Sequence, residues 1–319
     1  MNYSVETVSP NSVKALCALQ KEYSREVFKQ NITVDEGFYL NFPPLEYGKN
    51  VLCVFDSDSR MLGYCMVFKP LIDNESPDNV DYEMWCDLTI LPAYQDKQAI
   101  KNILYEKIID RAREIQKELP QRRIHLTKGI YPAEKYSIDL FKSKGLIERE
   151  VLKTLFVDIR ERPVEMVIPK EIEIIRYIPK DIAETMSYLR AHNQIFSENP
   201  FDPESLDAHF KSEGWKVGTL ICAFTREGDI VAGIKVYTYQ GGQGGERTGI
   251  SDSIFTLPEW RGKGIAKILI NESLRFLFEN NIKKACLEVS SLNENAFKLY
   301  TLMGYNVEYE RIIMIKPLL

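Results

Sequence analysis

The sequence has few of the residues from which metal sites and disulfide frameworks are built. It contains three histidines and six cysteines among 319 residues, and no two cysteines form a Cys-x-x-Cys pair. The histidines are too scattered to indicate a metal site or a catalytic triad. Most of the cysteines fall singly in apolar runs, which favours buried free thiols in a reducing compartment. The cysteines are Cys17, Cys53, Cys65, Cys86, Cys222 and Cys286, and the histidines are His125, His192 and His209.

An excess of positive charge, long apolar runs and a leader pattern are missing as well. The formal net charge is −5, which argues against a nucleic-acid-binding surface. No stretch approaches the ~20 apolar residues that a membrane span requires. Residues 1–16 lack a basic region followed by an apolar core, so no secretory leader is predicted. We therefore expect a cytoplasmic protein without a metal, a nucleic-acid partner or a membrane partner.

The most informative feature that is present is a glycine-containing junction between a strand and a helix. Apolar residues 250–257 predict the strand, and the run Arg261-Gly-Lys-Gly264-Ile-Ala266 leads into a predicted helix that ends at Glu279. A helix N-terminus presents unpaired N–H groups and the positive end of a dipole, so it favours a phosphate. Gly264 lets an anion approach the backbone, and Arg261 and Lys263 add positive charge. The pattern predicts capture of a diphosphate.

A second motif follows the first along the chain. Residues 293–305 read Asn-x-x-Ala-x-x-x-Tyr-x-x-x-Gly-Tyr, and the junction reads Arg-x-x-Gly-x-Ala. Together the two motifs resemble the GCN5-related N-acetyltransferase (GNAT) family, which holds the pyrophosphate of acyl-CoA at the first motif. The resemblance is strong over residues 170–319. It implies an α/β fold in which helices flank a central, mixed but mostly antiparallel sheet.

The resemblance implies acetyl-CoA as the acetyl donor. The loop would hold the diphosphate through backbone N–H groups, and the strand before it would pair with the pantetheine arm like an extra strand. Asn293 would cap the next helix and touch that arm. The residues implied in cofactor binding are Ile254, Phe255, Thr256, Arg261, Gly262, Lys263, Gly264, Ile265, Ala266, Asn293, Ala296 and Tyr300.

The chain reads as a divergent internal duplication. Residues 88–95 (Leu-Thr-Ile-Leu-Pro-Ala-Tyr-Gln) parallel residues 254–261 (Ile-Phe-Thr-Leu-Pro-Glu-Trp-Arg). In each half a helix, a strand, a short helix, a glycine and a strand pair are expected to follow. Charged, proline-containing residues near 160–170 predict the boundary, which gives two GNAT-like domains, 1–162 and 163–319. This tandem layout is similar to that of mycothiol synthase.

The first half keeps the layout but loses the chemistry of the motifs. Gln95 fits the first motif position, but Gln98 stands where Gly264 stands, and its side chain would occupy the phosphate position. Phe141 and Glu134 stand in place of the tyrosine and the asparagine of the second motif. We therefore expect the first domain to be degenerate and non-catalytic, with a structural or substrate-shaping role. The second domain is expected to bind acetyl-CoA and to be catalytic.

Acyl transfer to an amine requires a proton acceptor and a proton donor. The resemblance implies Tyr300 as the general acid, since a phenol with a pKa near 10 is protonated at neutral pH. For the base, Glu288 matches the glutamate of ribosomal-protein alanine N-acetyltransferases, and Asp252 is the alternative. By strand alternation, Asp252 shares a face with Ile254 and Thr256. The sequence leaves open whether Glu288, Asp252 or a water chain removes the proton.

Three further segments bear on the arrangement of the site. Residues 285–289 are apolar except at Glu288, so we expect a strand in the middle of a covered sheet. The acidic residues within 197–207 either line the acceptor site or serve as ordinary helix-start acids. The glycine-rich run 240–247 is expected to be a mobile hairpin loop near the acceptor.

The sequence thus predicts an acetyl-CoA-dependent N-acetyltransferase in which a primary amine attacks the thioester directly. The acceptor, a small-molecule amine or a peptide N-terminus, is left open, as are the acyl chain length and the choice between monomer and homodimer. The alternative is a non-catalytic acyl-CoA-binding sensor or interaction module. Tyr300 and Asn293 argue against that alternative, because a sensor does not need the acid.

Overall fold

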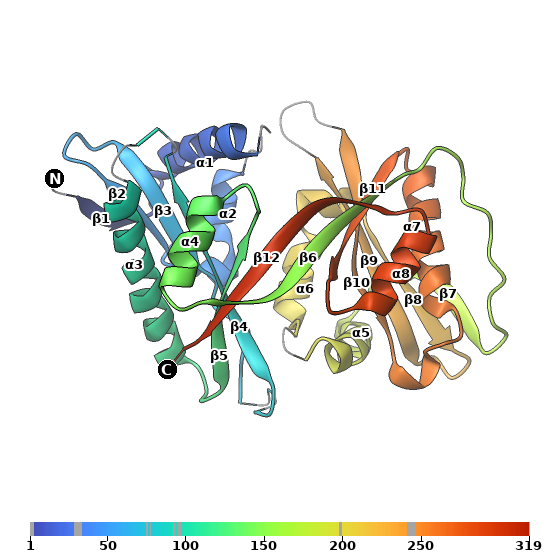
Figure 1. The fold of residues 1–319 in the computed structure, drawn as a ribbon. Helices are drawn as coiled ribbons and strands as arrows, with labels where there is room; N and C mark the ends of the chain where they lie inside the picture. The colour runs from blue at the N-terminus through green and yellow to red at the C-terminus, as the bar shows by residue number, and fades with distance from the viewer. Residues whose placement is uncertain are drawn as a thin grey trace. The chain divides into compact units, whose positions relative to one another are not determined.

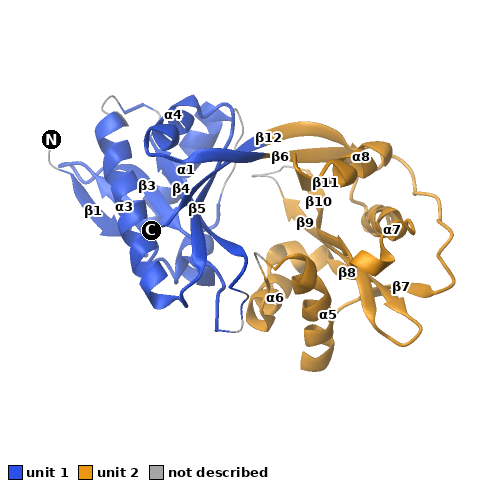
Figure 2. Ribbon diagram, turned by 60° about the horizontal axis from the view of Figure 1, so that its bottom comes forward, with its two compact units in different colours: residues 1–150, 311–319 blue, residues 151–310 orange. Residues whose placement is uncertain are grey.

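The computed structural model describes residues 3–28, 34–74, 76, 78–91, 93–94, 97–197, 200–240 and 246–318. These form two compact units (Figure 2), unit 1 with residues 1–150 and 311–319 and unit 2 with residues 151–310. From the sequence we expected one boundary, between residues 162 and 163. The chain instead enters unit 2 within strand β6 (Ile147–Asp158) and returns to unit 1 within strand β12 (Asn306–Pro317).

Unit 1 is a mixed sheet with helices on both faces (Figure 1). Its strands lie in the order β1-β2-β3-β4-β5-β12, and of the neighbours only β4 and β5 are parallel. The strands are β1 (Ser4–Thr7), β2 (Val51–Phe55), β3 (Met61–Val67), β4 (Asp81–Ile90), β5 (Arg123–Ile130) and the end of β12. The helices are α1 (Val13–Val27), α2 (Glu36–Asn41), the 3-10 helix η1 (Pro43–Leu45), α3 (Lys97–Glu118) and α4 (Lys135–Ser143).

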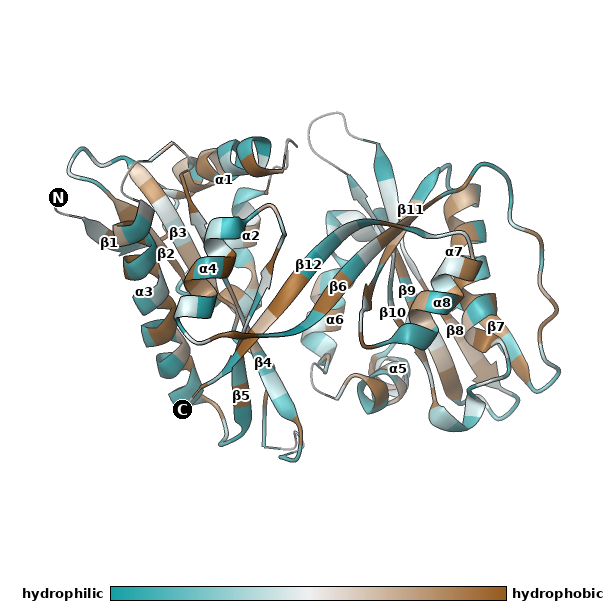
Figure 3. Ribbon diagram, in the orientation of Figure 1, coloured by the Kyte–Doolittle hydropathy of each residue, from teal (hydrophilic) through white to brown (hydrophobic). Residues whose placement is uncertain are grey.

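Two apolar clusters hold unit 1 together, one on each face of its sheet. One lies under α3 and α4, and the other lies under α1, α2 and η1. Helix α3 buries residues three or four positions apart, so one stripe of the helix faces the sheet, and many of its other residues are hydrophilic (Figure 3). This stripe consists of Ile100, Leu104, Ile108, Ala112 and Ile115.

Unit 2 repeats this architecture. Its strands lie in the order β7-β8-β9-β10-β11-β6, and of the neighbours only β10 and β11 are parallel. The strands are β7 (Ile172–Tyr177), β8 (Thr219–Thr225), β9 (Ile230–Gln240), β10 (Arg247–Thr256), β11 (Lys284–Ser290) and β6. The helices are α5 (Ile182–Ile195), α6 (Pro203–Phe210), α7 (Ile265–Glu279) and α8 (Glu294–Leu302), with the 3-10 helices η2 (Glu213–Val217) and η3 (Pro258–Trp260). The duplication and the mixed α/β fold expected from the sequence are therefore confirmed.

The two faces of the unit 2 sheet are covered by different helices. Apolar residues of α7 and α8 pack on one face, and those of α5, α6 and η2 pack on the other. The first cluster includes the rings of Tyr300 and Tyr305, and the second includes those of Tyr188, Trp215 and Phe255.

The last strand of each half differs from the expectation. We expected a strand pair after the glycine that ends each short helix, but one 12-residue strand follows in each half, β6 and β12. Moreover, β6 follows α4 of unit 1 and pairs with β11 of unit 2, while β12 follows α8 of unit 2 and pairs with β5 of unit 1. Each sheet is thus completed by a strand that follows the other half of the chain.

Neither a membrane-spanning helix nor a cluster of metal-ligating side chains is found among the described residues. No helix among them is both long enough and apolar enough to cross a membrane. No group of three or more histidine, cysteine or acidic side chains in the described ranges is arranged to hold a metal ion.

Candidate active site

The glycine-containing junction of unit 2 leaves a row of backbone N–H groups without carbonyl partners among the described residues. After η3, the chain passes through Arg261–Gly264 and enters α7, whose first intrahelical bond runs from Ile268 N–H to the Gly264 carbonyl at 3.2 Å. The N–H groups of residues 265–267 therefore have no partner within the helix. They lie at the positive end of the α7 dipole, where an anion is stabilised.

Both glycines of the junction adopt a conformation that other residues rarely take. Gly262 and Gly264 each have φ = +77°, in the left-handed region. A Cβ built on either glycine would meet nothing within 4 Å. The backbone is thus bare and open toward solvent at the point where the sequence predicts a diphosphate.

The two cations of the junction, Arg261 and Lys263, are exposed, and each contacts one neighbouring group. The Arg261 Nε–H donates to the Thr256 carbonyl at 3.1 Å, and the Lys263 ammonium lies 4.1 Å from the Trp260 ring centroid. These contacts fix the stems of both side chains while the exposed charges remain available to an anion.

Strands β10 and β11 pair over two positions and then part. Their parallel pairs are Gly249 with Ala285 and Ile250 with Cys286, and within the described residues no further pair joins them. Beyond these positions β10 continues to Thr256, bonded on its β9 side. The other edge of β10 is therefore free to take an extended ligand as an added strand.

A β-bulge lies in the part of β10 that pairs with β9 but not with β11. The register with β9 shifts between Asp252 and Phe255, and Ser253 has φ = +50°. Because a bulge inserts an extra residue, it reverses the alternation of side chains beyond it. Phe255 packs with the α5–α6 cluster, whereas Ile254 packs with the α7–α8 cluster.

The structure contradicts one prediction about Asp252. By alternation we expected Asp252 to share a face with Ile254. Asp252 instead pairs with Lys235, and its neighbour Ser251 bonds Ser273 of α7, so Asp252 lies on the α5–α6 face. The prediction was wrong because regular alternation stops at Ser253.

Tyr300 and Asn293 lie on or beside helix α8. Tyr300 is 6 % exposed in the α7–α8 cluster, and its ring centroid is 6.3 Å from that of Tyr305. Burial raises the pKa of Tyr300 to about 12, so the phenol is protonated at neutral pH. The Asn293 side chain accepts from the Ala296 N–H at 3.1 Å and caps the helix, as predicted.

Glu288 is exposed and lies on the opposite face from Tyr300. Its neighbours in β11, Leu287 and Val289, are buried in the α7–α8 cluster, so Glu288 points to the α5–α6 side. Thr154 Oγ1 of β6 donates to Glu288 at 3.1 Å. The expectation that β11 is covered on both faces was wrong, because the face of Glu288 is open to water.

Asp252 and Glu288 share one face and one neighbour. Burial is the main cause that raises the pKa of Tyr237 on β9, and both carboxylates raise that pKa further. Burial alone would raise the pKa of Asp252, but the Lys235 ammonium and the Ser253 N–H, 2.6 Å from Oδ1, lower it below its ordinary value. Lys235 was missed in the sequence, where the only signal is one lysine inside the apolar run 230–236.

The acidic segment between α5 and α6 has a structural use. Asp202 is the N-cap of α6 and accepts from the Ser205 N–H at 2.5 Å. Of the two interpretations offered by the sequence, the helix-start role is the one observed for Asp202. Residues 198–199 and 241–245, including most of the glycine-rich run, lie outside the described residues.

Comparison with protein families gives one match. Residues 186–305 match the model of the acetyltransferase (GNAT) family. The matched segment runs from α5 through the junction to Tyr305 and includes every site residue described above except Thr154.

Unit 2 is a GNAT domain.

Comparison with solved structures extends the likeness of fold to the whole chain. A GCN5-related N-acetyltransferase from Sphaerobacter thermophilus has a TM-score of 0.75 and 15 % identity, over 99 % of this chain and 96 % of that one. A tandem GNAT protein from the clavulanic acid biosynthesis pathway has a TM-score of 0.70 and 13 % identity, over 99 % of both chains. A glucosamine N-acetyltransferase region of a fungal multi-domain β-N-acetylglucosaminidase has a TM-score of 0.68 and 16 % identity, over 98 % of this chain and 38 % of that one. The search of curated proteins found no match.

Unit 1 has the GNAT layout, but its own side chains bridge the opening between its parallel strands. Strands β4 and β5 pair from Asp81–Arg123 to Trp85–Thr127. Just beyond, the buried Lys128 ammonium of β5 lies 2.5 Å from Asp87 Oδ1 of β4. In the GNAT domain of unit 2 the corresponding strands part without such a bridge among the described residues.

In unit 1, different side chains also stand at the positions that correspond to the two motifs of unit 2. The buried Glu134, which replaces the asparagine, accepts from Tyr23 Oη at 2.5 Å and from the Tyr131 N–H at 2.9 Å. Gln98 lies exposed in the first turn of α3, and Phe141 is fully buried. Gln95 lies outside the described residues.

We expect Lys128→Met to destabilise unit 1. The substitution leaves the Asp87 carboxylate without its buried partner, and breaking such a pair costs about 3 kcal/mol, the lower end of the usual range because Asp87 is partly exposed. Urea unfolding followed by circular dichroism measures the change. Exchange of the exposed Lys142→Met on α4 is the control, and an equal loss in both variants would contradict a special role for the buried pair.

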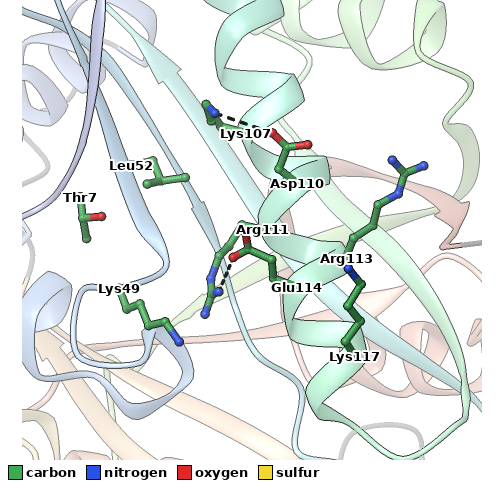
Figure 4. Close-up of a pocket in the computed structure, with 9 residues that line it drawn as sticks. All are labelled: Thr7, Lys49, Leu52, Lys107, Asp110, Arg111, Arg113, Glu114 and Lys117. Atoms are coloured by element: carbon green, nitrogen blue, oxygen red, sulfur yellow. Dashed lines mark hydrogen bonds and ion pairs between the residues drawn. The ribbon is translucent and has the colours of Figure 1, made fainter.

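A cavity of about 540 Å³ lies in unit 1, away from these positions (Figure 4). Four of its seven charged residues pair with one another, Lys107 with Asp110 at 3.7 Å and Arg111 with Glu114 at 2.6 Å. It runs along the second half of α3, where the helix dipole does not favour an anion. It therefore differs from the phosphate position of a GNAT domain. Its lining is Thr7, Lys49, Leu52, Lys107, Asp110, Arg111, Arg113, Glu114 and Lys117.

Proposed function

We propose that the protein is an acetyl-CoA-dependent N-acetyltransferase whose unit 2 transfers an acetyl group to a primary amine. The observation that carries the proposal is the junction at Arg261–Gly264, where two left-handed glycines open the start of α7 next to the free edge of β10. Membership of unit 2 in the GNAT family supports acyl-CoA-dependent transfer.

The residues of unit 2 fit the shape and charge of CoA. The N–H groups of residues 262–267 would bind the diphosphate, with Arg261 and Lys263 neutralising its charge. The free edge of β10 at residues 254–256 would pair with the amides of the pantetheine arm. Asn293 uses its side-chain oxygen as a cap, which leaves its amide NH₂ group to donate to the same arm.

Acetyl-CoA supplies the activated acetyl thioester, and the chain's residues would move the protons. The amine nitrogen attacks the carbonyl carbon, and the C–S bond breaks as the amide forms. Tyr300 gives its proton to the departing thiolate and regains one from solvent. The amine would approach from the α5–α6 face and lose its proton to water held by Glu288 or Asp252, the two carboxylates on that face. A backbone N–H of the β10 bulge would stabilise the oxyanion.

Unit 1 has a structural or substrate-shaping role in this proposal, and it does not take a second CoA. The support is the Lys128–Asp87 bridge across its opening together with Gln98 at the place of Gly264. We therefore expect one molecule of acetyl-CoA per chain.

A thiol-release assay tests the proposed function. The full chain with acetyl-CoA and a panel of primary amines should release free CoA at a rate that depends on the amine. Tight acetyl-CoA binding without amine-dependent release would instead indicate a non-catalytic acyl-CoA-binding module. Absence of both binding and release would contradict the assignment of unit 2 as a transferase.

A further inference from the structure

A buried lysine stands directly behind the half-exposed carboxylate of Asp252. Lys235 of β9 lies opposite Asp252 of β10 in the antiparallel register, with Nζ 3.1 Å from Oδ2. The Lys235 side chain is 2 % exposed, whereas that of Asp252 is 42 % exposed. A buried ammonium is costly unless it is paired, so Lys235 is held at Asp252 and Asp252 faces the solvent side.

Aromatic rings fix the position of the lysine. Its ammonium lies 4.3 Å from the ring centroid of Phe201 and 6.0 Å from that of Tyr237. Phe201 is itself tied in place, because the Asn193 side chain bonds both its N–H and its carbonyl. Lys235 therefore approaches Asp252 from one direction only and leaves the opposite side of the carboxylate open.

Several buried polar atoms around this pair have no hydrogen-bond partner in the described part of the chain. They are Tyr188 Oη, His192 Nε2 and Trp215 Nε1, from side chains more than nine-tenths buried, and His209 Nε2. Burial lowers the pKa of His192 and of His209 to about 4, and the Lys235 ammonium adds to this effect. Both imidazoles are neutral at physiological pH, so they add no charge to the pair.

We propose that Asp252 binds the amino group of the acceptor and that Lys235 is the residue that positions Asp252 for this contact. Asp252 lies beside the bulge where β10 and β11 part, next to the edge proposed for the pantetheine arm. Each of its oxygens uses one lone pair, Oδ1 for the Ser253 N–H and Oδ2 for Lys235, and each keeps another for an acceptor N–H. This inference rests on the proposed function and assigns its acceptor.

The charge of the pair favours a monoamine over a polyamine. Lys235 offsets the charge of Asp252, so the pair itself adds no surplus of negative charge to the face that it shares with Glu288. The nearby acids are engaged elsewhere, since Asp202 caps α6 and Asp207 pairs with Lys211 at 2.5 Å. A polycation would meet no row of free carboxylates on α6, whereas a single ammonium beside aromatic rings is matched.

The ionisation of Asp252 depends on every group that faces it. In wild type the carboxylate is ionised across the working pH range, because the Lys235 ammonium holds its pKa below the ordinary value against the effect of burial. Without that ammonium the carboxylate protonates at higher pH, so the acid limb of the rate profile moves up. The groups around it are Lys235 and Tyr237 of β9, Tyr188 and His192 of α5 and His209 of α6, and Glu288 acts on the shared neighbour Tyr237.

Four variants of the full chain test the assignment, namely Asp252→Asn, Lys235→Met, Lys235→Arg and the double variant Asp252→Asn/Lys235→Met. The amines are 2-phenylethylamine, spermidine and a short peptide with a free N-terminus. With the best amine, Asp252→Asn and Lys235→Met should each raise the acceptor KM about 10-fold, as expected for loss of a charge-assisted hydrogen bond. Lys235→Met should also shift the acid limb upward, and Lys235→Arg should restore most of the wild-type profile.

The remaining readouts separate a positioning role from a loss of fold. The affinity for acetyl-CoA should be unchanged in all four variants, and the double variant should be no worse than Asp252→Asn, because both act through one contact. Thiol release by wild type with an unchanged acceptor KM in Asp252→Asn and Lys235→Met, and an unchanged acid limb in Lys235→Met, would overturn this inference alone. No release by wild type with any amine would overturn it together with the proposed function, and a preference for spermidine would overturn the monoamine class.

Discussion

Gly264→Glu should abolish measurable binding of CoA to unit 2. A Cβ built on Gly264 meets nothing within 4 Å, so the new side chain is expected to project into the space where the diphosphate is proposed to sit. A like charge at about 4 Å costs a few kcal/mol near a protein surface, which lowers affinity by about 100-fold or more. Isothermal titration calorimetry with acetyl-CoA measures the loss.

The chain offers a matched control for this substitution. Gly228, in the turn between β8 and β9, also has a left-handed φ, of +94°, and a Cβ there also meets nothing within 4 Å. Gly228→Glu therefore introduces the same strain and the same charge in unit 2 without touching α7. We expect it to bind acetyl-CoA as wild type does. Equal losses in the two variants would mean that strain or net charge, and not the junction, explains the effect.

Tyr300→Phe should lower kcat by about 100-fold or more while acetyl-CoA affinity stays near the wild-type value. Removal of a positioned general acid typically costs this much, and the ring that packs against Tyr305 is retained. The control is Tyr305→Phe, which removes a phenol from the neighbouring buried ring and should leave kcat within about threefold. An unchanged kcat in Tyr300→Phe would exclude the phenol from the proton transfer.

The pH dependence of the reaction bears on the same residue. The phenol donates its proton only below its pKa, and burial raises that pKa to about 12 in the free protein. Ionisation of Tyr300 should therefore cause no fall in kcat/KM up to about pH 11. An alkaline limb near pH 9 that disappears in Tyr300→Phe would contradict a buried, protonated tyrosine.

The local parts of the site could be predicted because their causes lie within short stretches of sequence. The junction follows from two glycines between an apolar strand and an apolar-striped helix, and both elements are observed, as β10 and α7. The cap by Asn293 depends on residues three positions apart, and the apolar alternation on either side of Glu288 correctly placed it on a strand. In each case propensity, pattern and capping agree with the fold.

The remaining features depend on contacts between distant residues. The bulge at Ser253 interrupts the alternation at one left-handed residue that is not a glycine. No sequence pattern predicts such a residue. Lys235 is buried because it pairs with Asp252 on the neighbouring strand. A lysine within an apolar run does not identify that partner. The exchange of β6 and β12 between the sheets is likewise set by pairing with β11 and β5, so a boundary read from composition near residue 162 does not follow the compact units.

A crystal structure of the full chain with acetyl-CoA would test the central claim most directly. The account predicts one molecule per chain, with its diphosphate oxygens within hydrogen-bonding distance of the N–H groups of residues 262–267 and its pantetheine amides paired with β10. A diphosphate bound instead at the start of α3 in unit 1, or one molecule in each unit, would contradict it.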